Sequence, residues 1–175
     1  MPDLFLYKAA TSPLLLSVPH AGTALPGEIY AQLSERGLAL DDTDWFVDRL
    51  YDWVPEIGGG LLVARHSRYV VDLNRPPDDT NLYPGKDTTG LCPIDTFAKQ
   101  PLYRMGEEPD ATEMRHRVGT YWKPYHTKLQ GEIARLKSTH GCALLWEAHS
   151  IASQVPRFFP GRLTDFNLGT ADGAS

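Results

Sequence analysis

Two short apolar runs, each ending at a histidine, constrain the fold of this chain more than any other feature of its sequence. The first run covers residues 13–18 and leads to His20, and the second covers residues 142–148 and leads to His149. Short continuous apolar runs are typical of strands that are buried on both faces of a sheet. Ligands of such sheets bind at the carboxyl ends of the strands. The sequence therefore predicts two buried strands that carry both histidines to a ligand-binding edge.

The chain between these two runs alternates between strand and helix patterns. Residues 61–64 and 69–73 predict two further strands, joined as a hairpin. Apolar residues spaced three and four apart predict helices over 42–54 and 110–138. Pro124 predicts a kink in the second helix, or two helices in tandem. This order of elements predicts an α/β fold in which helices cover a mixed sheet.

Length and composition fit one ordinary globular domain. The chain has 175 residues, of which 42% are hydrophobic and 22% are charged, and a domain of about 150 residues is usual. Residues 74–109 hold six prolines, which predicts a functional excursion or a mobile flap rather than a linker. We therefore expect a single domain over residues 1–175.

Charge and targeting signals indicate what the chain does not bind. The formal net charge is −5 and there is no long basic run, which argues against nucleic acid or an anionic membrane as a partner. The apolar run at residues 14–16 is too short to span a bilayer, and no secretion signal precedes it. Cys92 and Cys142 show no CxxC spacing and fit a reduced compartment. We expect a cytoplasmic protein.

Two histidines at strand ends and nearby carboxylates have the composition of a metal site. Asp44 and Asp48 are expected one turn apart on the same face of the helix over 42–54. Two imidazoles and one carboxylate leave a divalent ion such as Zn²⁺ with open positions for water and substrate. The pattern leaves an alternative open, in which one or both histidines only pack in the core or cap an element.

A second polar cluster follows the predicted strand at 69–73. Asn74 and Arg75 place an amide and a guanidinium at its end, and Arg68 and Asp72 lie close by in the sequence. A guanidinium fork binds a substrate carboxylate through two parallel hydrogen bonds. In the alternative interpretation, Asp72 and Arg75 pair with partners on the surface.

Six motifs in a fixed order carry a resemblance to a known family across essentially the whole chain. They are residues 17–22 (SVPHAG), 42–51 (DTDWFVDRLY), 67–76 (SRYVVDLNRP), 81–84 (NLYP), 121–126 (YWKPYH) and 147–150 (EAHS). The sequence resembles the N-formylglutamate amidohydrolases, also called N-formylglutamate deformylases. The resemblance implies hydrolysis of N-formyl-L-glutamate to L-glutamate and formate in histidine degradation. It also implies a three-layer, phosphorylase/hydrolase-like fold related to the zinc carboxypeptidases.

The same resemblance implies roles for individual residues. The metal, expected to be Zn²⁺, is bound by His20, Asp44 and His149, with Asp48 as the rival carboxylate. The substrate is a small N-acyl amino acid, and its carboxylates are bound by Arg68, Asn74 and Arg75. Glu147 replaces an aspartate of the relatives, and we expect it to accept an imidazole N–H or to cap the strand.

One departure from the family bears on catalysis. The related peptidases use a glutamate late in the chain, whereas no glutamate follows His149 here. We therefore expect a domain that lacks its C-terminal part, with the catalytic glutamate beyond Ser175. Such a chain would bind metal and hydrolyse N-formylglutamate poorly. The alternatives are a deacylase for another N-acyl amino acid and a non-catalytic remnant that binds metal or carboxylates.

Overall fold

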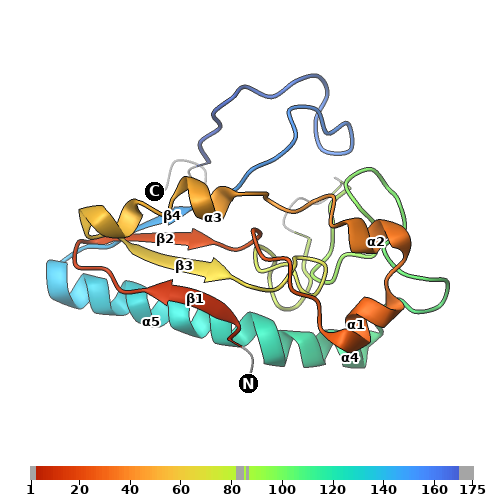
Figure 1. Ribbon diagram of the computed structural model, residues 1–175, viewed down its shortest axis with the longest axis horizontal. Coiled ribbons are helices and arrows are strands. Elements are labelled where there is room, and N and C mark those ends of the chain that lie inside the picture. Colours follow the sequence, from red (N-terminus) through yellow and green to blue (C-terminus); the bar gives the residue numbers. More distant parts are fainter. Residues whose placement is uncertain (1–2, 82–84, 86, 170–175) are drawn as a thin grey trace.

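A four-stranded mixed sheet forms the centre of the protein. The computed structural model describes residues 3–81, 85 and 87–169, so residues 82–84 of the NLYP motif lie outside the described part. The strands are β1 (Phe5–Lys8), β2 (Leu14–Val18), β3 (Gly60–Ala64) and β4 (Leu144–Glu147), in the spatial order β1-β3-β2-β4 (Figure 1). Strand β2 pairs in parallel with β3 and β4, and β1 pairs antiparallel with β3. The carboxyl ends of β2, β3 and β4 therefore lie at one edge.

Both predicted histidine-bearing strands are present, but only the first is buried. Strand β2 is central and its last four residues are buried. Strand β4 lies at the end of the sheet, where Leu144, Leu145 and Trp146 are 58%, 37% and 39% exposed. The prediction that 142–148 is a buried strand is therefore wrong. An apolar run shows that burial of its side chains would be favourable, but it does not show that another element packs over the strand.

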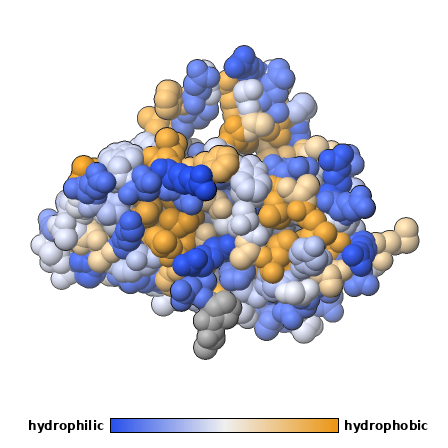
Figure 2. Space-filling model, viewed as in Figure 1, coloured by the Kyte–Doolittle hydropathy of each residue, from blue (hydrophilic) through white to orange (hydrophobic). Residues whose placement is uncertain are grey.

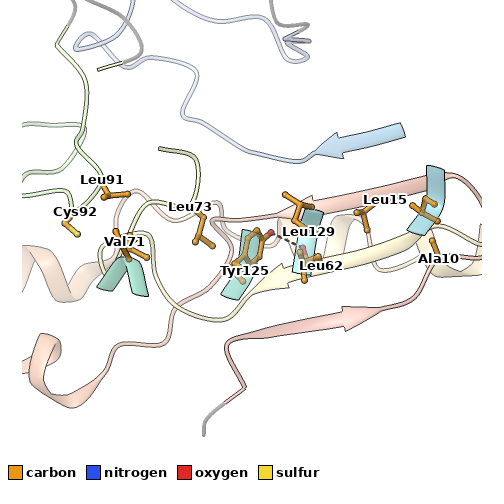
Figure 3. Close-up of a cluster of buried hydrophobic side chains, with 12 residues drawn as sticks. Ala10, Leu15, Leu62, Val71, Leu73, Leu91, Cys92, Tyr125 and Leu129 are labelled. Carbon is orange, nitrogen blue, oxygen red and sulfur yellow. Dashed lines mark hydrogen bonds between the residues drawn. The ribbon is translucent and has the colours of Figure 1, made fainter. Parts of the chain in front are cut away.

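A long helix covers one face of the sheet, as the apolar stripe over 110–138 predicts. It begins as α4 (Ala111–Arg117), passes through a π-helical turn, η2 (Val118–Trp122), and continues as α5 (Lys123–His140). Tyr125 and Leu129 of α5 pack in one core cluster with Leu15 and Leu62 of the sheet (Figure 3). The disturbance predicted at Pro124 takes the form of the π-helical turn, since proline cannot donate the backbone hydrogen bond that an α-helix needs there.

The opposite face of the sheet is covered by shorter pieces. Val47 of α3 (Val47–Leu50) and Val54 of the 3₁₀ helix η1 (Val54–Ile57) pack in one cluster with Leu16 of β2. Figure 2 shows further apolar side chains at the surface between α3 and α5.

The helix predicted over 42–54 is much shorter than expected. Phe46 has a φ of +64°, a left-handed conformation that an α-helix does not contain, so the helix starts only at Val47. Asp44 and Asp48 consequently do not share a helix face, and that prediction is wrong. Most of the large apolar side chains of the predicted stripe are exposed, including Trp45, Phe46, Leu50 and Trp53.

Residues 69–73 do not form the predicted second strand of a hairpin. Strand β3 already has β1 and β2 as its neighbours, so neither of its edges is free for another strand. Tyr69 and Val70 are instead buried in a separate cluster with Ile29 and Leu33. This cluster lies beside α1 (Gly27–Gln32) and α2 (Glu35–Ala39), two short helices that the sequence patterns do not predict.

The described residues of 74–109 contain no helix or strand, as their prolines predict. Buried anchors hold this segment on the core, among them Leu91, Cys92 and Leu102. Arg117 of α4 is fully buried beside it and donates hydrogen bonds to Val70 O and Tyr103 Oη. Of the helices in the described residues, none is both long enough and apolar enough to cross a membrane.

Candidate metal centre

The three predicted metal ligands meet at the carboxyl edge of the sheet. His20 follows β2 and His149 follows β4, so the parallel pairing of these strands brings both imidazoles to the same place. Asp44 Oδ2 lies 3.1 Å from His149 Nδ1 and 3.7 Å from His20 Nδ1. One ligand atom from each of the three residues lies within 4.8 Å of the others. Asp48 is outside this group.

A local backbone contact positions the aspartate. The Asp44 N–H donates to His20 O over 3.1 Å, which ties the turn before α3 to the end of β2. The left-handed Phe46 then allows the chain to leave this turn and enter α3. The side chain of Asp44 is thereby buried against both histidines.

His20 is oriented by a buried carboxylate. Its Nε2 donates to Asp72 Oδ1 over 2.8 Å, and Asp72 also accepts from Arg68 Nη2 over 2.5 Å and from the Asn74 N–H over 2.8 Å. A proton on Nε2 leaves the lone pair of Nδ1 directed toward Asp44. Carboxylates that orient imidazoles in this way are typical of metal-binding histidines.

The surroundings of His20 Nδ1 fit a metal ion. This nitrogen is buried and has no hydrogen-bond partner, which is costly for a polar atom in a protein core. It faces the Asp44 carboxylate at a distance longer than a hydrogen bond. A cation held between the two atoms would satisfy both, and two imidazoles with one carboxylate are a donor set that suits Zn²⁺.

The electrostatics of the site also favour a cation. Burial alone would raise the pKa of the Asp44 carboxyl, but the hydrogen bond to His149 and the nearby imidazole of His20 outweigh it and hold that pKa below its usual value. Burial would likewise raise the pKa of Asp72, and the charge of Arg68 reverses the effect. Burial and Arg68 would lower the pKa of His20, yet the nearby carboxylates raise it. The ionised carboxylates of Asp44 and Asp72 thus keep negative charge beside the two imidazoles, where a cation would be stabilised.

A cavity of about 390 Å³ opens beside this centre. Its walls come from the two histidine-bearing strand ends, from the segment over 74–97 and from the segment after β4. They consist of His20, Asp44, Arg68, Asn74, Arg75, Asp87, Thr88, Phe97, His149, Ser150, Ile151 and Phe158. All the predicted metal-binding and substrate-binding residues therefore line one cavity.

Hydrogen bonds to the protein fix the guanidinium of Arg75 and leave some of its N–H groups for a ligand. Its Nε donates to Thr89 O over 2.9 Å, its Nη2 to Thr89 Oγ1 over 3.2 Å and its Nη1 to Asn74 O over 2.8 Å. Each terminal nitrogen carries two N–H groups, so each keeps one beyond these contacts. This geometry suits a bidentate bond to a carboxylate. Asn74, the preceding residue, also lines the cavity, and its Nδ2 lies 3.4 Å from His149 Nε2.

The sequence patterns do not predict several contacts of the functional residues. Asp72 is fully buried as the partner of His20, which excludes the surface pair considered for it. Its hydrogen bond to the backbone two residues ahead is typical of aspartate before a turn, and that signal was available in the sequence. The Arg68 guanidinium lies 4.8 Å from the centre of the Phe97 ring. Glu147 Oε1 is 3.8 Å from His149 Nε2, too far for the predicted hydrogen bond.

A buried arginine fixes the segment after β4 against the cavity. Arg157 Nη1 lies 2.7 Å from Asp95 Oδ1, and Arg157 Nη2 lies 2.9 Å from Asp87 Oδ1. These ion pairs hold the wall that contributes Ile151 and Phe158. The described part of this segment contains no helix or strand, so the ion pairs rather than regular structure position the wall.

Fold and site together define an α/β protein with a candidate metal centre next to an anion-binding arginine. The family model for N-formylglutamate amidohydrolase matches residues 12–175. The chain belongs to the N-formylglutamate amidohydrolase family, which confirms the resemblance carried by the six motifs.

Two curated relatives share this family. The N-formylglutamate deformylase of Pseudomonas aeruginosa is 51% identical over 175 residues, which cover 100% of this chain and 65% of that protein. The N-formylglutamate deformylase of Pseudomonas putida is 47% identical with the same coverage. The chain therefore spans just under two thirds of the length of these relatives.

Solved structures share the fold. The crystal structure of N-formylglutamate amidohydrolase from Ralstonia eutropha JMP134 matches with a TM-score of 0.79 and 27% identity, over 97% of this chain and 66% of that one. A gene product from Agrobacterium tumefaciens matches with a TM-score of 0.66 and 23% identity, over 89% of this chain and 60% of that one. The predicted mixed α/β fold is confirmed.

Proposed function

We propose that this chain carries the metal-binding and substrate-binding part of an N-formylglutamate deformylase. The reaction is hydrolysis of N-formyl-L-glutamate to L-glutamate and formate, as one step of histidine degradation. The single observation that supports it most is the convergence of His20, Asp44 and His149 with the fork of Arg75 in one cavity. The identity with two curated deformylases agrees with this assignment.

The metal centre would activate the formyl group. His20, Asp44 and His149 would hold a divalent ion, which we take to be Zn²⁺ from its donor set. When bound, such an ion lowers the pKa of a water molecule toward about 7 and polarises a carbonyl oxygen. Asp72 would keep His20 in the tautomer that leaves Nδ1 free for the ion.

Two arginines would bind the carboxylates of the substrate. Arg75 presents its two remaining terminal N–H groups, and Asn74 adds an amide beside the metal centre. Arg68 also lines the cavity, although its Nη2 donates to Asp72. N-formyl-L-glutamate carries two carboxylates, so Arg75 would bind one and Arg68 would attract the other.

Proton transfer needs a further group. Among the described residues that line the cavity, the carboxylates are those of Asp44, assigned to the metal, and Asp87, which pairs with Arg157 and Lys99. Neither is placed to serve as a general base. We propose that these residues bind metal and substrate but release formate slowly.

We extend the proposal to the fold family of the chain and to its cellular compartment. Helix α5 and the α3 region lie on opposite faces of the sheet, which supports a three-layer, phosphorylase/hydrolase-like fold in one domain related to zinc carboxypeptidases. The acidic net charge of −5 supports a small-molecule substrate over nucleic acid or an anionic membrane. We place the protein in the cytoplasm on the sequence signals alone.

Calorimetric titration of the zinc-loaded chain with N-formyl-L-glutamate tests this function. We expect saturable binding that Arg75→Ala weakens about tenfold or more, because a bidentate charged contact is lost. Arg65→Ala is the matched control, since Arg65 is half exposed and outside the cavity lining. Unchanged affinity in Arg75→Ala would assign the carboxylate elsewhere. Equal or tighter binding of N-acetyl-L-glutamate would favour a deacylase for a longer acyl group.

A formate assay tests the proposal that the described cavity residues include no general base. We expect the zinc-loaded chain to release formate far more slowly than the Pseudomonas aeruginosa relative under the same conditions. Comparable rates in the two proteins would show that the described residues already contain the proton-transfer group.

A further inference from the structure

The turn that carries Asn74 and Arg75 is held by two ring donors from one helix. Trp122 Nε1 donates to Arg75 O over 2.9 Å, and His126 Nε2 lies 2.9 Å from Leu73 O. Because a carbonyl oxygen only accepts, the His126 Nε2 atom carries the proton. The two bonded carbonyls bracket Asn74, the residue whose amide lies next to the metal centre.

The remaining carbonyl of the turn is also bonded. Asn74 O accepts from Nη1 of Arg75. All three consecutive carbonyls from Leu73 to Arg75 therefore have side-chain donors, and two of these donors come from outside the turn. Because each of these carbonyls is already hydrogen-bonded, the turn loses little conformational entropy when it binds a ligand.

The two rings support each other. Trp122 and His126 are one helical turn apart, and their rings stack with centroids 3.8 Å apart and an interplanar angle of 26°. Both side chains are partly buried. Burial lowers the pKa of His126 below its usual value, which keeps a neutral imidazole with one N–H, and that N–H is the one directed at Leu73.

The π-helical turn sets the direction of these rings. Val118–Trp122 is π-helical and ends directly at the first of the two donors. A π-turn inserts one residue, which rotates the following side chains by about 100° relative to an uninterrupted α-helix. The π-helical turn therefore sets the direction of Trp122 and His126 relative to the side chains of α4.

We propose that Trp122 and His126 are positioning residues for the carboxylate-binding pair Asn74 and Arg75. They fix the backbone on both sides of Asn74, so that the guanidinium and the amide point into the cavity before substrate arrives. This inference rests on the proposed function, and it assigns a role to the YWKPYH motif at residues 121–126, which the metal and substrate contacts leave without one.

The metal ligands have anchors that the two ring donors do not touch, since His20 is bonded to Asp72, although Asp72 also accepts from the Asn74 N–H of this turn. The Asp72 carboxylate is held by Arg68, and the Asp72 N–H donates to Leu91 O over 2.7 Å. Loss of the ring donors should therefore loosen the carboxylate-binding side of the cavity while zinc binding is kept. If Trp122 and His126 had a purely structural role, their loss would weaken carboxylate binding and zinc binding together.

The test uses Trp122→Phe, which removes the N–H and keeps an aromatic ring. Titration of the zinc-loaded variant with N-formyl-L-glutamate should show affinity weakened about tenfold, with zinc content unchanged. Trp53→Phe is the matched control, because Trp53 Nε1 also donates to a backbone carbonyl, Leu50 O, over 2.9 Å but lies outside the cavity lining. Its affinity should equal that of the unmodified chain.

Two further variants keep the test decisive if Trp122→Phe folds poorly. His126→Leu should weaken binding, and His126→Gln should restore most of the affinity because its amide can still donate to Leu73 O. Equal affinities in the Leu and Gln variants would overturn the proposal, as would unchanged affinity in a folded Trp122→Phe.

A double-mutant cycle separates this inference from the proposed function. In an Arg75→Ala background, Trp122→Phe should have a smaller effect than in the unmodified chain, because part of its action passes through Arg75. Additive losses would contradict a positioning role. If Arg75→Ala alone leaves binding unchanged, the proposed function fails; if it weakens binding while Trp122→Phe does not, only the positioning role fails.

Discussion

His20 and His149 end neighbouring parallel strands and face the same carboxylate, yet the protein surrounds them differently. The side chain of His20 is 2% exposed and its Nε2 is bonded to Asp72. The side chain of His149 is 32% exposed, and its Nε2 lies 3.4 Å from the amide of Asn74. One ligand is built into the core, whereas the other is supported mainly by Asp44.

The strands that precede the two histidines show the same contrast. Strand β2 has a partner on each side and helices over both faces, whereas β4 has one partner and exposed side chains on both faces. Apolar residues on both faces are typical of an interior strand. We therefore expect loss of the metal ligand to lower folding stability at His20 but not at His149.

His20→Ala should have the largest effect, because it removes a ligand and a buried contact together. We expect loss of bound zinc and a free energy of unfolding lower by about 3 kcal/mol in the metal-free state, from the lost bond to Asp72 and the cavity left behind. Metal analysis and urea denaturation in chelator measure the two effects. An unchanged denaturation midpoint would mean that His20 is not part of the core.

His149→Ala should remove zinc equally well but leave the fold almost as stable. The free energy of unfolding of the metal-free variant should stay within about 1 kcal/mol of the parent, because the ring is partly exposed. The same two measurements apply. A destabilisation as large as that of His20→Ala would erase the contrast, and a full complement of zinc would exclude His149 as a ligand.

Asp72→Asn should weaken zinc binding through His20 without removing any ligand. Loss of a carboxylate that orients a metal-binding histidine costs about 10- to 100-fold in metal affinity. Competition with a chromogenic chelator measures the change. Glu147→Gln is the comparison on the His149 side, where the carboxylate lies 3.8 Å away, and it should change the affinity less. Equal losses in both variants would count against a special role for Asp72.

Leu145→Ala should have the smallest effect and tests the contrast between the strands themselves. Leu145 pairs in register with Leu15, which is 1% exposed. We expect Leu145→Ala to cost less than about 1 kcal/mol and Leu15→Ala to cost about 3 kcal/mol in urea denaturation. Similar costs at both positions would show that β4 is as well packed as β2.

The sequence is informative where local pattern and tertiary structure agree. The apolar run before His20 predicts β2, and the stripe containing Tyr125 and Leu129 predicts the helix on the sheet. Parallel pairing of two runs that end in histidine then brings the ligands together. The helical pattern does not distinguish Asp44 from Asp48, whereas the family resemblance implies Asp44, the carboxylate that lies beside both histidines. The helix predicted to carry both aspartates starts only at Val47.

Other features depend on contacts that no local pattern encodes. The apolar residues Tyr69 and Val70 suggest a strand, but they pack under short helices rather than pair in the sheet. Strand β1 has only four residues and is fixed by its pairing with β3. The exposure of β4 and the left-handed Phe46 are likewise tertiary outcomes, since the same residues in other surroundings would be buried or helical.

The number of zinc ions bound per chain, measured for matched carboxylate variants, shows whether His20, Asp44 and His149 together bind one metal ion. Mass-spectrometric metal analysis after zinc loading and removal of excess metal should give one zinc per chain for the parent and for Asp48→Asn, and none for Asp44→Asn. A parent chain without zinc, or an Asp44→Asn variant that keeps its full complement, would exclude a metal centre at these three residues.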